Sequence, residues 1–241
     1  MVLKRQVDKG VILAAGDGER LGSLTTTCPK VLLPIKGKPL ISYPIKALAA
    51  AGISEIAIVV GYLADKVIEV LGNGNYFGVR LQYIFNPDYL GGNAISVNKV
   101  RDWTQGDPVI LLMGDHLIER KLVSRFLNRL TLSDTLCIDY TPAKHLHLAE
   151  ATKVIVDGVG CIKDIGKDLI YWDAIDMGVF LLTGNFFQVL DELVPELGID
   201  IEISDVIRFL VSRGHRFNTC GVNGRFWADV DTEEDLKRVA K

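Results

Sequence analysis

Strand-length apolar runs alternate with helical patterns through the first half of this chain. An apolar run at residues 11–15 is followed by a helical pattern at 40–51, and the alternation reaches another apolar run at 109–113. Between these lie an expected strand, helix, strand and helix, at 56–60, 63–71, 79–85 and 93–103. This order is typical of parallel strands joined by crossover helices that cover both faces of one sheet. The sequence therefore predicts an α/β fold with a mostly parallel, mixed sheet and helices on both faces.

The second half is less regular but shows no change in composition. We expect helices at 121–130, 186–193, 203–211 and 232–239, and strands at 135–140, 152–156, 178–182, 216–222 and 225–229. Thr232, followed three residues later by Asp235, predicts the N-cap of the last helix. Pro44 lies inside the helix expected at 40–51, so that helix should kink or start late. Because no linker-like stretch interrupts the chain, we expect a single domain over residues 1–241, with inserted strands around 140–175.

The charge balance and the apolar runs exclude several classes of protein. The 27 Lys and Arg residues are matched by 30 Asp and Glu, which gives a net charge of -3. This balance lacks the basic surface with which proteins bind nucleic acid phosphates. No apolar run approaches the roughly 18 residues of a membrane span, and the N-terminus lacks a signal-peptide pattern. We therefore expect no nucleic acid partner, no membrane insertion and a cytoplasmic location.

The most informative segment is the small-residue loop after the first expected strand. Glycines allow close approach of backbone N–H groups to a phosphate chain. Arg20 and Lys30 follow the loop, ten residues apart. The Rossmann fingerprint, which needs glycine at Leu21, does not fit, and neither does a Walker A motif. A loop of this kind is suited to holding a triphosphate, with a solvated turn as the alternative. The candidate nucleotide-binding residues are Leu13, Ala14, Ala15, Gly16, Asp17 and Gly18.

Residues 13–41 resemble the N-terminal signature of the sugar-phosphate nucleotidylyltransferase family, LAAGxGxRL followed by PKxLLPxxGKPLI. Weaker similarities at 86–96, 113–116, 176–180 and 226–235 extend the resemblance over the whole chain. Within the family, the segments GGNAIS, GDH and WADVDT are most similar to CTP:inositol-1-phosphate cytidylyltransferases, and then to phosphocholine cytidylyltransferases. The resemblance implies a Rossmann-like fold, Mg²⁺, and transfer of a nucleotide to a phosphomonoester with release of pyrophosphate.

This chemistry is compatible with the residues that the sequence offers. A phosphomonoester is largely dianionic at neutral pH, since its second pKa is about 6, and can itself act as the nucleophile. No general base is required, and the sequence contains no convincing Ser/His/Asp or Cys/His arrangement. Transfer then depends on positioning and on neutralising charge. Arg20 and Lys30 are the candidate catalytic residues.

Three aspartates are candidate ligands of the metal. Asp115 follows the apolar run at 109–113, and the carboxyl ends of parallel strands usually open into a ligand crevice. Mg²⁺ typically takes one or two carboxylates together with substrate oxygens, although an aspartate after a strand can also serve only as a cap. Many relatives carry a box similar to WxDTGT, whose metal aspartate corresponds to Asp229, whereas in the choline-type relatives the ligand corresponds to Asp231. Both stay open at this point.

Further residues are candidates for binding the base and the acceptor. Backbone and amide groups of Asn86, Gly91, Gly92, Asn93 and Ala94 can approach a flat base, and Asn93 has the alternative role of capping the helix that follows. For the acceptor, the resemblance assigns Lys167 to its phosphate and Asp176 to its hydroxyls. His116 is expected to orient the loop or contact substrate. Lys144 and Lys153 are weaker basic candidates, and each of these charges has a solvated surface role as its alternative.

These observations give a leading function and several alternatives. The leading prediction is Mg²⁺-dependent transfer of CMP from CTP to inositol-1-phosphate, giving CDP-inositol and pyrophosphate. Within the same class, the acceptor could be phosphocholine, or the reaction could be uridylyl or thymidylyl transfer to a hexose-1-phosphate. A different class is a non-catalytic relative that binds nucleotides. The resemblance also implies possible fusion to, or cooperation with, a membrane CDP-alcohol transferase, and an oligomer is compatible with the sequence.

Overall fold

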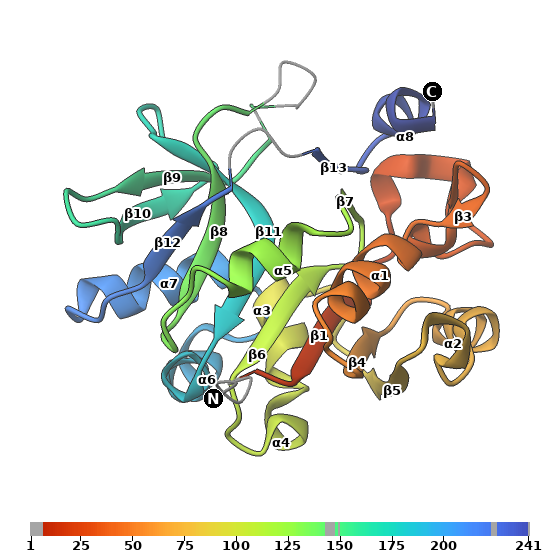
Figure 1. The fold of residues 1–241 in the computed structure, drawn as a ribbon, viewed down its shortest axis with the longest axis horizontal. Coiled ribbons are helices and arrows are strands. Elements are labelled where there is room, and N and C mark those ends of the chain that lie inside the picture. Colours follow the sequence, from red (N-terminus) through yellow and green to blue (C-terminus); the bar gives the residue numbers. More distant parts are fainter. Residues whose placement is uncertain (1–6, 143–147, 149, 223–225, 241) are drawn as a thin grey trace.

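The computed structural model describes residues 7–142, 148, 150–222 and 226–240. At its centre lies a sheet in which β5, β4, β1 and β6 are neighbours and run parallel (Figure 1). These strands are β1 (Lys9–Ala14), β4 (Glu55–Val60), β5 (Arg80–Phe85) and β6 (Val109–Met113). The strands expected from the alternating pattern are thus confirmed.

The other half of the sheet is mostly antiparallel. Strand β11 (Ala174–Leu182) pairs antiparallel with β6 and also with β8 (Thr135–Asp139). Beyond β11 the sheet continues with β9 (Lys153–Val156) and β10 (Ile162–Gly166), which form the expected insertion around 140–175. The remaining strands are β12 (Asn218–Gly221), parallel to β8, and the small pairs of β2 (Pro34–Ile35) with β3 (Lys38–Pro39) and β7 (His116–Ile118) with β13 (Trp227–Asp229).

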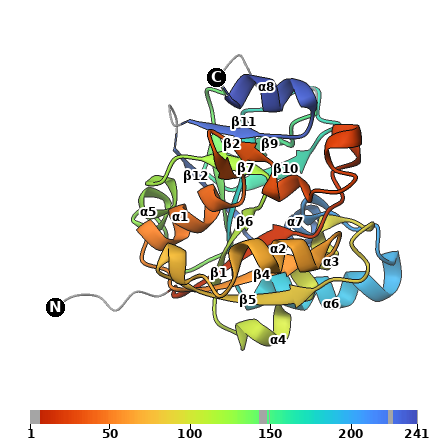
Figure 2. The ribbon, with the colours of Figure 1, turned by 90° about the vertical axis from the view of Figure 1, so that its right-hand side faces the viewer.

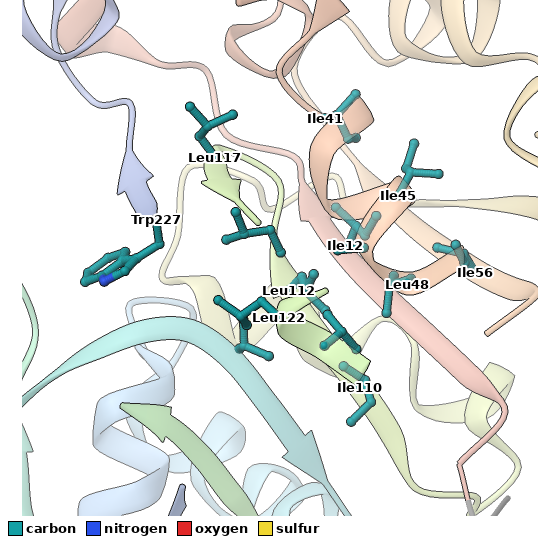
Figure 3. Close-up of a cluster of buried hydrophobic side chains, with 14 of the residues drawn as sticks. Ile12, Ile41, Ile45, Leu48, Ile56, Ile110, Leu112, Leu117, Leu122 and Trp227 are labelled. Carbon is teal, nitrogen blue, oxygen red and sulfur yellow. The ribbon is translucent and has the colours of Figure 1, made fainter. Parts of the chain in front are cut away.

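Helices cover both faces of the sheet, as the sequence predicts. Along β1, Ile12 and Ala14 belong to one hydrophobic core, whereas Val11 and Leu13 belong to the other. Figure 3 shows Ile12 of the first core beside Leu48. The first core includes α1 (Ser42–Ala50), α2 (Ala64–Leu71) and α5 (Leu122–Leu127), and the second includes α3 (Asn93–Asn98), α6 (Gly184–Leu197) and α7 (Ile203–Ser212).

Helix α1 starts late, one of the two outcomes expected from Pro44, which lies in its first turn, where the missing N–H has no intrahelical acceptor to lose. Other helix boundaries differ from the expectations: α5 ends at Leu127 instead of residue 130, and α6 extends beyond the expected 186–193 at both ends. The single helix expected at 93–103 is wrong, because α3 ends at Asn98 and α4 (Arg101–Thr104) begins after the fully buried Val100. The expected cap of α8 (Glu233–Ala240) is confirmed, since the Thr232 amide donates to Asp235 and the Asp235 amide donates back to the Thr232 hydroxyl.

Short 3-10 helices connect some of these elements, at Glu19–Leu24, Lys30–Leu32 and Asn75–Phe77. Figure 2 shows α8 at one end of the molecule and α4 at the opposite end. Among the residues described, no helix is long and apolar enough to cross a membrane.

The parallel strands place two loops at the same edge of the sheet. The loop of small residues at 15–18, called the glycine loop below, follows β1. Asp115 follows β6, the strand that pairs with β1. The Gly114 amide donates to the Leu13 carbonyl at 2.8 Å, and a Cβ at position 114 would lie 2.5 Å from that oxygen. Glycine is therefore needed before Asp115, because it lets the two loops touch backbone to backbone.

Candidate active site

Lys30 joins three segments that are far apart in the sequence. Its side chain is only 10% exposed, and its ammonium group donates to Asp115 Oδ2 at 2.7 Å and to Asp231 Oδ1. Lys30 begins a 3-10 helix, Asp115 lies between β6 and β7, and Asp231 lies between β13 and α8. The fold thus brings one predicted catalytic cation between two predicted metal ligands.

Arg20 completes this network from the other side. One of its guanidinium nitrogens lies 2.7 Å from Asp231 Oδ2, and the other donates to Glu150 Oε2 at 3.1 Å. The Arg20 side chain is half exposed, in contrast to that of Lys30. Arg20 can therefore move to a ligand more easily than Lys30, and Asp231 links the two cations.

The local charges keep Lys30 and Asp115 ionised. Burial alone would raise the pKa of Asp115, but the Lys30 ammonium and the hydrogen bond with His116 hold that pKa well below its ordinary value. Burial likewise opposes the charge on Lys30, but Asp115 and Asp231 raise its pKa. The pair is therefore an ion pair beside the glycine loop.

His116 connects Asp115 with the interior of the site. Its Nδ1 lies 2.8 Å from Asp115 Oδ1, and its ring stacks on Trp227 with the centroids 6.1 Å apart. A Cβ at Gly178 would lie 2.8 Å from His116 Nε2, so the glycine leaves room for the imidazole. Trp227 is itself fixed, because its indole N–H donates to Asp139 at 3.0 Å. His116 thus contacts the Asp115 carboxylate, and its predicted role of orienting the loop or contacting substrate stays a prediction.

Two adjoining cavities meet at this network. The first, of about 610 Å³, is lined by the glycine loop, and the second, of about 530 Å³, extends toward Lys167 and Asp176. Arg20, Asp115 and Asp231 line both cavities. Two ligands that occupied the two cavities would therefore meet beside these three side chains.

The glycine loop lines the first cavity with most of the residues predicted for it. Gly18 has a φ of 68°, and a Cβ there would lie 2.8 Å from the Lys30 Cβ. Glycine is thus required both by the backbone conformation and by the close contact with Lys30. Five of the predicted residues line this cavity and Ala15 lines the second, the five being Leu13, Ala14, Gly16, Asp17 and Gly18.

The segment predicted to hold the base divides into two groups. Gly91 and Asn93 line the cavities, whereas Gly92 and Ala94 pack against the segment at 199–201. Asn86 is 1% exposed, donates its amide N–H to the Ser96 hydroxyl and accepts from the Asp88 amide. It lies beneath the cavity wall. The Asn93 side chain also caps a helix, but that helix is α7, because its Oδ1 accepts from the Ile203 amide at 2.7 Å.

The second cavity carries the residues predicted for the acceptor. Lys167 and Asp176 both line it, and burial raises the pKa of Asp176 to about 6. Arg208 of α7 faces the same space and is held by Asp164 and Asp168, each at 2.9 Å. Lys153 donates to the Lys167 carbonyl and so supports the loop, whereas Lys144 lies outside the described residues.

The aspartates predicted as metal ligands are not equivalent. Asp115 and Asp231 converge on the same Lys30 nitrogen, whereas Asp229 pairs with His116 in the β7–β13 ladder. Burial and the neighbouring Asp231 and Asp115 raise the pKa of Asp229, against the opposing effect of His116. In the part of the chain that the structure describes, no group of three or more His, Cys, Asp or Glu residues is arranged to hold a metal ion.

Sequence reasoning missed three polar residues of the site. Glu150 contacts Arg20 from a loop that shows no hydrophobic periodicity in the sequence. Arg208 lies in α7, and Glu202 directly precedes that helix. A capping signal does exist at Glu202 and Asp205, which form a capping box, but such a signal predicts only a helix start. Nothing local indicates that α7 lines the second cavity.

Two adjoining cavities at the carboxyl ends of parallel strands, lined by cations and carboxylates, suit an α/β nucleotide-binding protein. The family model described as nucleotidyl transferase matches residues 9–142, which is more than half of the chain. This chain belongs to the nucleotidyl transferase family.

Its similarity to known proteins extends over nearly the whole chain. It is 27% identical over 240 residues to the glucose-1-phosphate thymidylyltransferase of Streptomyces griseus, covering 96% of this chain and 64% of that protein. It is 30% identical over 235 residues to the bifunctional IPC transferase and DIPP synthase of Aquifex aeolicus, covering 98% of this chain and 51% of that protein. The chain thus spans between half and two thirds of the length of these two relatives.

A solved structure shows the same fold. The inositol-1-phosphate CTP transferase from T. maritima matches with a TM-score of 0.84 and 23% sequence identity, covering 99% of this chain and 98% of that one. This likeness confirms the Rossmann-like α/β architecture that the sequence resemblance implies.

Proposed function

We propose that this protein transfers CMP from CTP to inositol-1-phosphate and releases pyrophosphate. The observation that carries the proposal is the network of Arg20, Lys30, Asp115 and Asp231 at the junction of the two cavities. The names of the Aquifex relative and of the T. maritima structure support inositol phosphate and CTP as substrates.

The two cavities suggest how the substrates meet. The triphosphate would lie against the glycine loop, and the acceptor would lie beside Lys167 and Asp176. An oxygen of the acceptor phosphate then attacks the α-phosphorus, the bond from that phosphorus to the β-phosphate oxygen breaks, and pyrophosphate leaves with the electron pair. Lys30 and Arg20 neutralise the charge that develops on the phosphates, which is the main catalytic need in such transfers.

The carboxylates beside Lys30 have the chemistry that a magnesium ion requires. Asp115 and Asp231 both direct an oxygen at one cation, the Lys30 ammonium, so the pair is arranged around positive charge. We therefore assign Mg²⁺ to Asp115 and Asp231, with Asp229 outside its ligand set. When bound, the ion would screen the phosphates and lower the cost of bringing two anions together.

Contacts to the base would come from the backbone around Gly91, which lines both cavities. A carbonyl there can accept a hydrogen bond from the amino group of cytosine, whereas uracil presents an acceptor at that position. One such contact can discriminate by about 1–3 kcal/mol. We therefore propose CTP as the preferred nucleotide on this chemistry together with the name of the T. maritima structure.

The acceptor cavity favours a polyol over choline. A quaternary ammonium group is usually held by exposed aromatic faces, but Phe180 and Trp227, which line this cavity, are only 2% and 4% exposed. The half-buried Tyr89 lines this cavity and the first one, so it is a single aromatic face at their junction rather than a cage. The charged side chains of Lys167, Asp176 and Arg208 suit a phosphate and hydroxyl groups instead. The Streptomyces griseus relative keeps glucose-1-phosphate thymidylyl transfer as the second candidate.

The proposal also concerns the fate of the product. Because the names of several relatives describe bifunctional proteins of which this chain spans about half, we propose that a CDP-alcohol transferase, on the same or another chain, consumes the CDP-inositol.

Pyrophosphate release, measured with Mg²⁺ for each nucleoside triphosphate against each acceptor, tests the proposed function. The acceptors are inositol-1-phosphate, phosphocholine and glucose-1-phosphate. We expect the highest kcat/KM for CTP with inositol-1-phosphate. A higher value for dTTP or UTP with glucose-1-phosphate would favour the second candidate, and no release with any pair would favour a non-catalytic nucleotide-binding protein.

A further inference from the structure

The loop at 91–94 is joined backbone to backbone to the segment before α7. The Gly92 amide donates to the Ile199 carbonyl at 2.8 Å, and the Ala94 amide donates to the Ile201 carbonyl at 3.0 Å. A Cβ at Gly92 would lie 2.2 Å from the Ile201 oxygen, and one at Gly91 would lie 2.5 Å from the Ile199 oxygen. The two backbones are therefore in direct contact.

Two side chains cross the same contact in opposite directions. Asn93 Oδ1 accepts from the amide of Ile203, the first residue of α7, at 2.7 Å. Glu202 Oε2 accepts from the amide of Asn93, the first residue of α3, at 3.3 Å. Each side chain thus satisfies an otherwise unpaired amide at the start of the other helix. The link joins residues that are about 110 positions apart in the chain.

This cross-link exceeds what α7 needs for its own start. Helix α7 already has a local capping box, in which the Glu202 amide donates to Asp205 at 2.9 Å. The additional bonds through Asn93 join two cavity walls. Gly91 lines both cavities, whereas Ser204 and Arg208 of α7 line only the second, so the bonds tie a wall shared by the two cavities to a wall of the second cavity.

We propose that Asn93 and Glu202 are positioning residues that couple binding of the nucleotide to binding of the acceptor. The inference rests on the proposed function in one respect, the assignment of the two cavities to the two substrates. A nucleotide that orders the loop at 91–94 also orders the start of α7 through the cross-link. The acceptor then meets a wall that is already fixed, so its binding costs less conformational entropy and its affinity rises.

Calorimetry with the full chain measures this coupling. Inositol-1-phosphate is titrated with and without α,β-methylene-CTP, which cannot react because a methylene group replaces the oxygen at the bond that would break. For the wild-type protein we expect the analogue to tighten acceptor binding by about 5- to 30-fold, which is within the usual range of coupling between sites. For Asn93→Ala and Glu202→Ala we expect the ratio of the acceptor Kd without the analogue to the Kd with it to be near one, whatever the affinity of the variant for each ligand alone.

Two matched variants separate coupling from a structural role. Glu202→Gln keeps an oxygen that can accept from the Asn93 amide, so it should keep the wild-type ratio. Asp205→Ala removes the side-chain half of the α7 capping box that Asp205 supplies but leaves the Asn93 cross-link, so it should lower the melting temperature and keep the ratio. A purely structural role would make Asn93→Ala behave like Asp205→Ala, and that result would overturn the proposal.

The outcome also distinguishes this inference from the proposed function. If the wild-type protein binds UTP or dTTP analogues and glucose-1-phosphate instead, the proposed substrates are wrong. The ratio of glucose-1-phosphate affinities with and without that nucleotide analogue then tests the coupling. A wild-type ratio of one with the ligands that bind, or an unchanged ratio in Asn93→Ala, would contradict the coupling itself.

Discussion

Lys30 and Asp115 are 85 positions apart in the chain, yet the ammonium group of Lys30 donates to the Asp115 carboxylate at 2.7 Å. Asp231 contacts the same nitrogen, and Arg20 contacts Asp231. In the proposed reaction, phosphates and a metal ion replace these internal contacts, so each charge has a distinct measurable role.

Lys30→Ala should mainly lower kcat, because the ammonium group is assigned to charge that develops in the transition state. Loss of one such group typically costs about 10²–10³-fold in rate. Lys163→Ala is the matched control, since that lysine is exposed on β10 and lines neither of the two cavities. Steady-state kinetics decide the role: an unchanged kcat with a raised KM would assign Lys30 to ground-state binding only.

Asp115→Asn and Asp231→Asn should each abolish most activity and raise the Mg²⁺ concentration needed for half-maximal rate. Asp229→Asn should leave that concentration within a few-fold of wild type, because Asp229 does not share the contact with Lys30. Activity measured across a Mg²⁺ titration compares the three variants. The metal assignment is wrong if the requirement rises in Asp229→Asn and stays constant in Asp231→Asn.

Asp176→Asn should change how stability depends on pH. Burial raises the pKa of Asp176 to about 6 in the folded protein, from the ordinary value of 3.8. The folded state therefore holds a proton that the unfolded state has lost, so the stabilisation is present below about pH 4 and is lost as the pH rises through 6. Asparagine keeps the oxygen that accepts from the Gly178 amide.

Denaturant unfolding at pH 4, 5, 6 and 7 tests this sign. The free energy of unfolding of Asp176→Asn minus that of the wild type should rise by about 1–3 kcal/mol from pH 4 to pH 7. A difference that is constant over this range would show that Asp176 titrates normally.

Gly114→Ala should destabilise the protein, because its Cβ would lie 2.5 Å from the Leu13 carbonyl oxygen at the contact between the two loops. We expect a loss of about 1–3 kcal/mol in the free energy of unfolding. At Gly158 a Cβ would meet nothing within 4 Å, so Gly158→Ala is the matched control and should change stability little. Equal stability of the two variants would contradict the close approach at Gly114.

The parts of the site that the sequence predicts are those with a local signal. Lys30 follows from a linear motif and Asp115 from the end of an apolar run, because strand periodicity and strand ends are encoded locally. The choice between Asp229 and Asp231 could not be made, since it depends on where β13 ends and on which carboxylate turns toward Lys30. The bond between Asn93 and Ile203 could not be predicted either, because it depends on how two distant helices pack.

The most direct test of the central claim is to determine the identity and stoichiometry of the products by ³¹P NMR, in a reaction with CTP, inositol-1-phosphate and Mg²⁺. We predict that the wild-type protein forms CDP-inositol and pyrophosphate in equal amounts, and that Lys30→Ala forms both far more slowly. Release of orthophosphate without CDP-inositol, or an unchanged rate in Lys30→Ala, would contradict nucleotidyl transfer at the site formed by Lys30, Asp115 and Asp231.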